Sequence, residues 1–172
     1  MWNLNDRAEF SACIQDIIDD EAVQSMDDIK HHVHNVTCLD HCVFVAYVSF
    51  VLCKKLKLNY TAAARAGLLH DLYLCDWSKT DVSRFRRLLI HPGMALKNAE
   101  KFALSDLERD IILKHMWPIT LRQIPCYRES AIVNLADKLC ACVEFMRLYN
   151  IFKAGRALSA FNRRRCTAFL AQ

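Results

Sequence analysis

The chain has 172 residues, 53% of them hydrophobic and 24% charged, which is the balance of a folded globular domain rather than a disordered segment. Its three glycines, Gly67, Gly93 and Gly155, cannot form the glycine-rich motifs G-x-G-x-x-G or G-x-x-x-x-G-K-[ST], so its chemistry must come from side chains. The net charge of +4 is uneven, because residues 1–30 carry eight acidic and two basic side chains, whereas residues 31–172 carry eleven acidic and 21 basic ones.

Apolar residues recur at helical spacing through most of the chain, and no segment has the alternation typical of a strand. We predict seven or eight helices among the segments 4–19, 22–29, 37–57, 60–73, 92–102, 105–116, 128–150 and 156–170. The predicted fold is an all-α bundle that forms one domain over residues 1–172. Its core covers about residues 30–145, with acidic helices before it and a basic helix after it.

Specific residues set some of these helix boundaries. The segment 37–57 is apolar on most sides and ends in lysines, as expected of a buried central helix. Asn59 or Thr61 is expected to cap the next helix. Pro92 is expected in the first turn of its own helix, where proline is tolerated, and Ser105 begins a capping-box sequence.

The nine cysteines lie mostly in apolar helical patterns and form no C-x-x-C pair, which favours reduced thiols over a disulfide framework or a zinc ribbon. The first ten residues contain no apolar core of a signal peptide. The longest apolar run, residues 43–53, is far shorter than the ~20 residues that span a bilayer. We therefore expect a cytoplasmic protein without a membrane partner.

A histidine and an aspartate stand side by side in the apolar sequence AGLLHDL, as His70 and Asp71. Burying both side chains is costly unless they have partners, and neutral imidazole and carboxylate are natural metal ligands. A capped helix end with a buried core histidine explains this pair equally well. His41, at the head of the segment 37–57, and Asp137, in the sequence IVNLADKL, add two more such groups in apolar helical patterns.

At His41, His70, Asp71 and Asp137 the sequence resembles the HD-domain metal-dependent phosphohydrolases. Their signature is a histidine, a His-Asp doublet and a distant aspartate, each on a different helix of an all-α bundle. The resemblance covers about residues 30–145. It implies that these four residues bind metal and that the chain hydrolyses a phosphoester.

Two further histidines, His91 and His115, lie between the doublet and the final aspartate, as in members of the superfamily that bind two metal ions. Six ligands suit two divalent ions better than one, and Asp71 is then the natural bridge. The mixed ligands favour iron or manganese, with magnesium, nickel, cobalt and zinc as alternatives. The other explanation is a pair of histidines at helix ends.

The chain departs from the family pattern at several positions. The sequence MWPIT at residues 116–120 stands where the cyclic-dinucleotide branch has Gly-Tyr-Pro, which argues against that substrate. The doublet is followed by Leu-Tyr-Leu instead of Ile-Gly-Lys, so Lys114, Lys138 or Arg86 is expected to serve the phosphate. Cys42 replaces a small hydroxyl residue, either as a packing change or as an oxidation-sensitive neighbour of the metal.

Candidate residues around the metal ligands follow from their distance along the chain. His32, in the sequence HHVH, is a candidate substrate contact, with an exposed loop as the alternative. Asp76 either orients the attacking water or caps a helix. The candidate catalytic residues are Asp71, Lys114 and Asp76, and the candidate substrate-binding residues are His32, Arg86 and Lys138.

The expected reaction is hydrolysis of a nucleotide or small phosphorylated metabolite by attack of a metal-bound hydroxide. The alternative is a non-catalytic helical binding module with a structural or remnant metal site. A nucleic-acid adaptor is not expected, because the basic run Arg163–Arg165 lacks the interleaved aromatic residues of a single-strand groove. A homodimer is compatible with the sequence.

Overall fold

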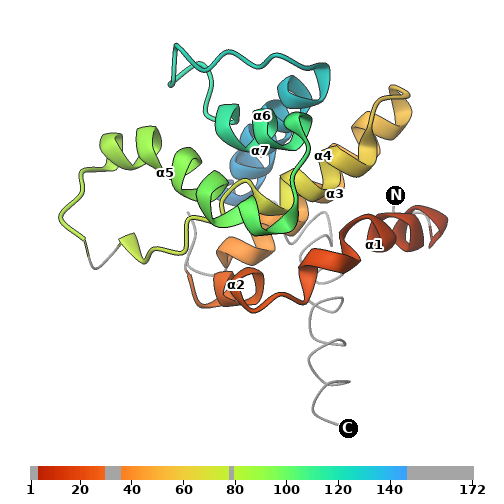
Figure 1. Ribbon diagram of the computed structural model, residues 1–172, viewed down its shortest axis with the longest axis horizontal. Helices are drawn as coiled ribbons and strands as arrows, with labels where there is room; N and C mark the ends of the chain where they lie inside the picture. Colours follow the sequence, from red (N-terminus) through yellow and green to blue (C-terminus); the bar gives the residue numbers. More distant parts are fainter. Residues whose placement is uncertain (1–3, 30–35, 78–79, 147–172) are drawn as a thin grey trace, which may run out of the picture.

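The computed structural model describes residues 4–29, 36–77 and 80–146, and within these ranges it contains seven α-helices and no β-strand (Figure 1). The all-α prediction is confirmed. The elements are α1 (Leu4–Ile18), α2 (Glu21–Gln24), the 3-10 helix η1 (Ser25–Asp28), α3 (Cys38–Lys55), α4 (Tyr60–Leu69), α5 (Arg84–Ala99), the 3-10 helix η3 (Glu100–Phe102), α6 (Asp106–Lys114) and α7 (Arg128–Phe145).

Helix α3 is the buried central helix predicted for residues 37–57. It begins with a complete capping box, in which the Thr37 hydroxyl accepts from the Asp40 amide and the Asp40 carboxylate accepts from the Thr37 amide. Twelve of its 18 residues are buried, among them Phe50 and Val43. Helices α1, α4 and α7 pack around it, with α4 in the most extensive contact (Figure 1).

The contact between α3 and α4 depends on Gly67. A Cβ atom at this position would lie 2.9 Å from Cα and 3.2 Å from the amide nitrogen of Ala46 in α3. Only a residue without a side chain allows this approach, because real Cβ atoms do not come so close to backbone. The C-terminal part of α4 is thereby held against the middle of the central helix.

Helix α4 is shorter at its end than predicted. Asn59 caps its start by accepting from the Ala62 amide at 3.0 Å, as one of the two predicted caps. The helix ends at Leu69 rather than near Tyr73, because the Tyr73 amide bonds to the Asp71 carbonyl at 2.8 Å and the chain turns. The His-Asp doublet therefore lies in a turn just after the helix instead of within it.

Helix α5 begins at Arg84, eight residues before the predicted start, and this prediction was wrong. Ser83 caps it, and Pro92 lies inside the helix rather than in its first turn. Proline removes one helical hydrogen bond, but His91 and Pro92 are both buried, so packing against the core outweighs the local cost.

The last two described helices are α6 and α7. Ser105 and Glu108 form the predicted capping box of α6, which ends at Lys114. Helix α7 ends at Phe145 rather than near residue 150. The predicted helix at 156–170 lies outside the described residues. No helix in the described part of the chain is both long and apolar enough to cross a membrane.

Candidate metal centre

His41 lies in the first turn of α3, and its ring is fully buried. Its Nδ1–H donates to the carboxylate of Glu144, with distances of 3.0 and 3.1 Å to the two oxygens. Its Nε2 atom faces Oδ1 of Asp137 at 3.2 Å. The two carboxylates are seven residues apart on α7 and so share one side of that helix, which His41 contacts through both ring nitrogens.

His70 and Asp71 enter the site from the turn after α4. His70 is fully buried, and its Nδ1–H donates to the Gly67 carbonyl at 2.8 Å. Because a carbonyl only accepts, this bond fixes the proton on Nδ1 and leaves the Nε2 lone pair directed at the carboxylates. Nε2 lies 3.7 Å from Oδ2 of Asp71 and 3.8 Å from Oδ1 of Asp137, without a hydrogen-bond partner among the described residues.

His91 of α5 and His115, which follows α6, are held in the same way. The Nδ1–H of His91 donates to the Arg87 carbonyl at 2.9 Å, and that of His115 donates to the Ile112 carbonyl at 2.8 Å. Their Nε2 atoms lie 2.9 Å from each other. Both face Oδ1 of Asp71, at 3.3 Å from His91 and 3.6 Å from His115.

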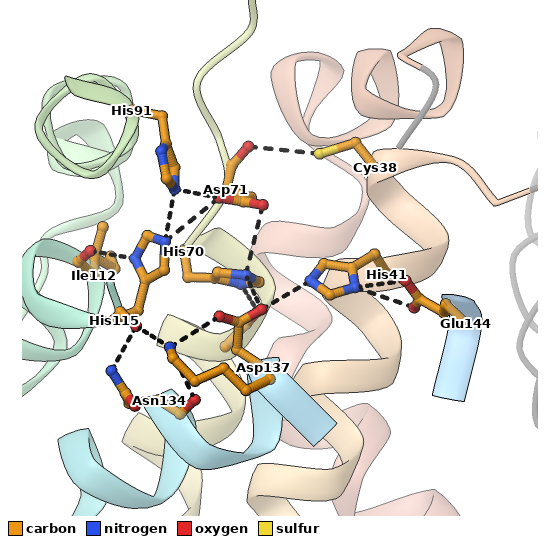
Figure 2. Close-up of polar contacts among 12 residues, drawn as sticks. Cys38, His41, His70, Asp71, His91, Ile112, His115, Asn134, Asp137 and Glu144 are labelled. Carbon is orange, nitrogen blue, oxygen red and sulfur yellow. Dashed lines mark hydrogen bonds and ion pairs between the residues drawn. The ribbon is translucent and has the colours of Figure 1, made fainter. Parts of the chain in front are cut away.

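Figure 2 shows the four rings and two carboxylates converging on one centre. The ligand atoms fall into two groups that share Asp71, namely His41, His70 and Asp71, and Asp71, His91 and His115. Within each group the ligand atoms lie within 4.8 Å of one another. Asp137 adds a carboxylate between His41 and His70.

This donor set fits divalent metal ions. Two neutral Nε2 atoms at 2.9 Å are both acceptors and repel each other unless a cation or proton lies between them. Two nitrogens bound side by side to one ion, each at about 2.1 Å, are separated by a similar distance. Backbone carbonyls that fix the far nitrogen of a histidine are a recurrent feature of metal sites. Asp71 is placed to contribute one oxygen to each group.

The electrostatics differ between the two groups. Burial opposes protonation of His41, but its hydrogen bonds to Asp137 and Glu144 outweigh burial and raise its pKa well above the usual value. Burial also raises the pKa of the Asp137 carboxyl, yet the hydrogen bond from His41 and the nearby His70 ring hold it below its usual range. Burial lowers the pKa of His115 to about 3, which keeps this ring neutral, the form that binds metal.

Two residues of α7 hold the histidine-bearing turn after α6. The buried Asn134 amide donates to the carbonyls of His115 at 2.6 Å and Trp117 at 2.7 Å. Lys138 donates to the His115 carbonyl at 2.8 Å, and its Nζ lies 3.6 Å from Oδ2 of Asp137. Helix α7 therefore supplies the Asp137 carboxylate to the centre and also holds the backbone of His115 (Figure 2).

The cluster opens into a cavity of about 880 Å³. Four of the converging residues line it, together with Lys138 and Asp76 from the predicted set. Aromatic and cationic side chains complete the wall, notably Tyr73, Trp77, Arg84 and Arg87. The buried donor set is thus accessible from a space large enough for a small molecule.

Two predicted substrate contacts are not brought to this cavity. Lys114 pairs with Asp110 and lies 2.9 Å from Sγ of Cys126, so its ammonium is already neutralised away from the cluster. Arg86 is exposed and does not line the cavity, whereas Arg84 and Arg87 do. The reason is the earlier start of α5, which places residues 84, 87 and 91 on one helix face and Arg86 about 100° away.

The remaining predicted residues have mixed outcomes. Asp76 is exposed at the cavity, and its choice between orienting water and capping a helix stays open. His32 lies outside the described residues. Cys42 is fully buried, and burial raises the pKa of its thiol well above the usual value, which favours the packing explanation over a reactive neighbour of the metal.

Glu144 and Asn134 were not predicted as part of the site. Both carry a signal in the sequence, since each lies at a helical interval from Asp137: Glu144 is seven residues after it and Asn134 three residues before it. Glu144 is a carboxylate that the structure buries almost completely, and such a group requires a partner. His41 is that partner.

A comparison with known protein families agrees with the metal-binding character of this cluster. The family model described as HD domain matches residues 38–142, which is more than half of the chain. The chain therefore belongs to the HD domain family, whose members bind divalent metals and for which metal-dependent phosphohydrolases are the general class. No curated protein and no solved structure matches the chain.

Proposed function

We propose that the chain is a metal-dependent phosphohydrolase that cleaves a nucleotide or another small phosphorylated metabolite. The observation that carries this proposal is the convergence of four histidine Nε2 atoms and two carboxylates beside a cavity of about 880 Å³. Membership of the HD domain family supports the same class of reaction.

Six residues would hold the metal, in two ligand groups that share Asp71 and that would suit two divalent ions: His41, His70, Asp71, His91, His115 and Asp137. Iron or manganese suits this mixture of imidazole and carboxylate. Divalent ions held here would acidify a water molecule and neutralise charge on a phosphoryl group.

The chain's own residues supply the remaining functions. The carbonyl-bound histidines keep their Nε2 lone pairs directed at the centre, and Glu144 does the same for His41 through its carboxylate. Lys138, whose side chain is 37% exposed, lies at the cavity wall and can donate to a phosphoryl oxygen. Asp76, a carboxylate in the cavity wall, is the candidate residue for orienting the attacking water.

The test is a panel of phosphomonoesters, phosphodiesters and nucleotides, assayed with anaerobically purified protein loaded with iron or manganese. We expect hydrolysis that a chelator abolishes and that Asp71→Asn lowers by at least about 100-fold. Asp81→Asn, which removes an exposed carboxylate outside the cavity, is the matched control and should leave the rate unchanged. Full activity in the Asp71 variant or in chelator would contradict the proposal.

A second pair of variants separates the two lysines. Lys138→Met should lower kcat/KM by about 10- to 100-fold, since it removes a cationic donor from the cavity wall. Lys114→Met should change it by less than about twofold, because that lysine is paired with Asp110 elsewhere. A chain that retains its metal but hydrolyses nothing in the panel would instead be the non-catalytic binding module.

A further inference from the structure

Helix α5 carries a row of cationic side chains that begins at the metal centre and leads outward. Arg87 and Arg84 lie four and seven residues before His91, on the same face of the helix, and all three line the cavity. A helical rise of ~1.5 Å per residue places them roughly 6 and 10 Å along the axis from His91. The inference drawn from this row rests on the proposed function.

The guanidinium of Arg87 is held in place. Its Nε–H donates to the Val82 carbonyl at 2.8 Å, and its Nη2 donates to the Thr80 carbonyl at 3.5 Å. Its Cζ atom lies 5.5 Å from the centre of the Trp77 ring. Val82 and Thr80 precede α5, so these bonds direct the side chain toward the start of the helix and away from His91.

Arg87 lines the cavity, and its Nη1 group forms no hydrogen bond to the described part of the chain. The aromatic rings continue from this point to the metal centre. Trp77 contacts Tyr73 at 5.5 Å between ring centres, and Tyr73 contacts His91 at 6.0 Å. Arg87 is therefore held in the wall of the same cavity, beside the candidate metal centre and outside its ligand set.

The charge of the cavity points to an anionic ligand once metal is present. Three cationic side chains, Arg84, Arg87 and Lys138, face four carboxylates in the wall, those of Asp28, Asp71, Asp76 and Asp137. Two divalent ions would reverse this balance and leave an excess of positive charge. A planar guanidinium with free N–H groups is suited to phosphate oxygens.

We infer that this face of α5 is a second phosphate subsite and that the substrate carries at least two linked phosphates. The phosphoryl group that is attacked lies at the metal centre, and its neighbour lies on Arg87, with Arg84 further out. Water adds to the attacked phosphorus while the P–O bond to the neighbouring phosphate breaks. The electron pair leaves on that phosphate, and the protons of the water pass to the two products.

The arrangement disfavours a simple monoester. A single phosphate at the metal centre would leave Arg87 unused, because its loop contacts hold it toward the outer end of the cavity. A linked phosphate would instead meet a guanidinium fixed before binding, so little side-chain entropy is lost. The developing charge on the leaving phosphate would be stabilised at the same place.

The experiment compares binding of inorganic pyrophosphate and inorganic phosphate by calorimetry, in metal-free and manganese-loaded protein. The variants are Arg87→Gln, Arg84→Gln and, as matched control, Arg86→Gln on another face of the same helix. Metal content is measured before and after each titration, so that removal of metal by pyrophosphate is counted separately. Thermal unfolding of each variant identifies any loss of fold, and Arg87→Lys provides a charged replacement.

We expect wild-type protein to bind pyrophosphate more tightly than phosphate. Arg87→Gln should weaken pyrophosphate by about 10-fold or more and phosphate by less than about twofold, with a smaller effect for Arg84→Gln. Arg87→Lys should recover part of the loss, and Arg86→Gln should change neither ligand.

Equal affinity for the two anions in wild type, or equal losses in all three glutamine variants, would overturn the inference. Failure of the proposed function has a different signature. A chain that holds no metal, yet binds pyrophosphate through Arg84 and Arg87, would contradict the hydrolase assignment and leave the phosphate subsite standing.

Discussion

At the scale of single residues, the arrangement of the centre follows from how each histidine is fixed on its far side. Three rings donate Nδ1–H to carbonyls of Gly67, Arg87 and Ile112, all within their own or the adjoining helix turn. His41 lies in the first turn of its helix, and its Nδ1–H donates to a carboxylate of α7, that of Glu144. Glu144 thereby gives His41 more basic character than a carbonyl would.

The first prediction concerns this carboxylate. Glu144→Gln keeps an oxygen that can accept from His41 but removes the negative charge, so we expect metal affinity to fall by about 10- to 100-fold. Titration of the metal-free protein with manganese measures the change. Glu100→Gln, an exposed residue at the end of α5, is the control. An affinity that does not differ between the two variants would contradict the role of Glu144.

Burial made His70, Asp71 and Asp137 candidates, because histidine and aspartate in apolar helical patterns need partners, but the full set of six was nominated by the resemblance to the HD-domain family. Their convergence is a property of the structure, and their role as ligands stays a prediction. The structure places Lys114 in an ion pair with Asp110 rather than in the cavity wall, and the four-residue spacing of the two on one helix is a sequence signal for that pair.

At the scale of helices, the most extensive contact in the described part of the chain is between α3 and α4, where Gly67 lies against Ala46. We expect Gly67→Ala to destabilise the fold by about 1–3 kcal/mol, because the new methyl group meets the Ala46 backbone at 2.9 Å. Gly93→Ala should be neutral or stabilising by up to ~1 kcal/mol, because no atom lies within 4 Å of its new Cβ and alanine favours the helix. Urea unfolding of both variants measures the difference. Equal free energies of unfolding for the two variants would contradict the requirement for glycine at position 67.

Asp110 joins α6 to the loop before α7 and gives a pH-dependent prediction. Burial alone raises the pKa of its carboxyl, but Lys114, the Ser130 hydroxyl and the Cys126 amide hold it below the usual value. A carboxyl with a depressed folded pKa contributes stability that is present above its unfolded pKa, near ~3.9, and is lost as the pH falls through the folded value.

Asp110→Asn should therefore cost about 1–3 kcal/mol at pH 7, and this difference from wild type should shrink as the pH falls below about 4. Unfolding in urea between pH 7 and pH 3 tests this. A stability difference that grows toward low pH would contradict a stabilising role for the ionised Asp110 carboxylate.

The boundaries of the helices were less predictable than their existence. Capping residues placed the starts of α4 and α6 correctly, because a side chain that accepts from a nearby amide is a local signal. Pro92 misplaced the start of α5, because the burial of His91 and Pro92 is a tertiary effect that no local pattern reveals. The earlier start of the helix brings Arg84 and Arg87 to the cavity, and neither was among the predicted residues.

At the scale of the molecule, five helices or the turns that follow them supply the converging groups, from α3 through α7. A ligand bound by all of them cross-links most of the described fold. We expect a chelator to lower the free energy of unfolding, by ~2.7 kcal/mol relative to protein in metal at 100 times its dissociation constant. Calorimetric melting with and without manganese measures this shift, and an unchanged melting temperature would contradict a site shared among the helices.

The metal content per chain tests the central claim most directly. Elemental analysis of anaerobically purified protein should give two divalent ions per chain in the wild type. Asp71→Ala removes the carboxylate that the two ligand groups share, so it should lose most of both ions. Wild-type protein without metal, or an unchanged metal content in Asp71→Ala, would contradict the bridged metal centre.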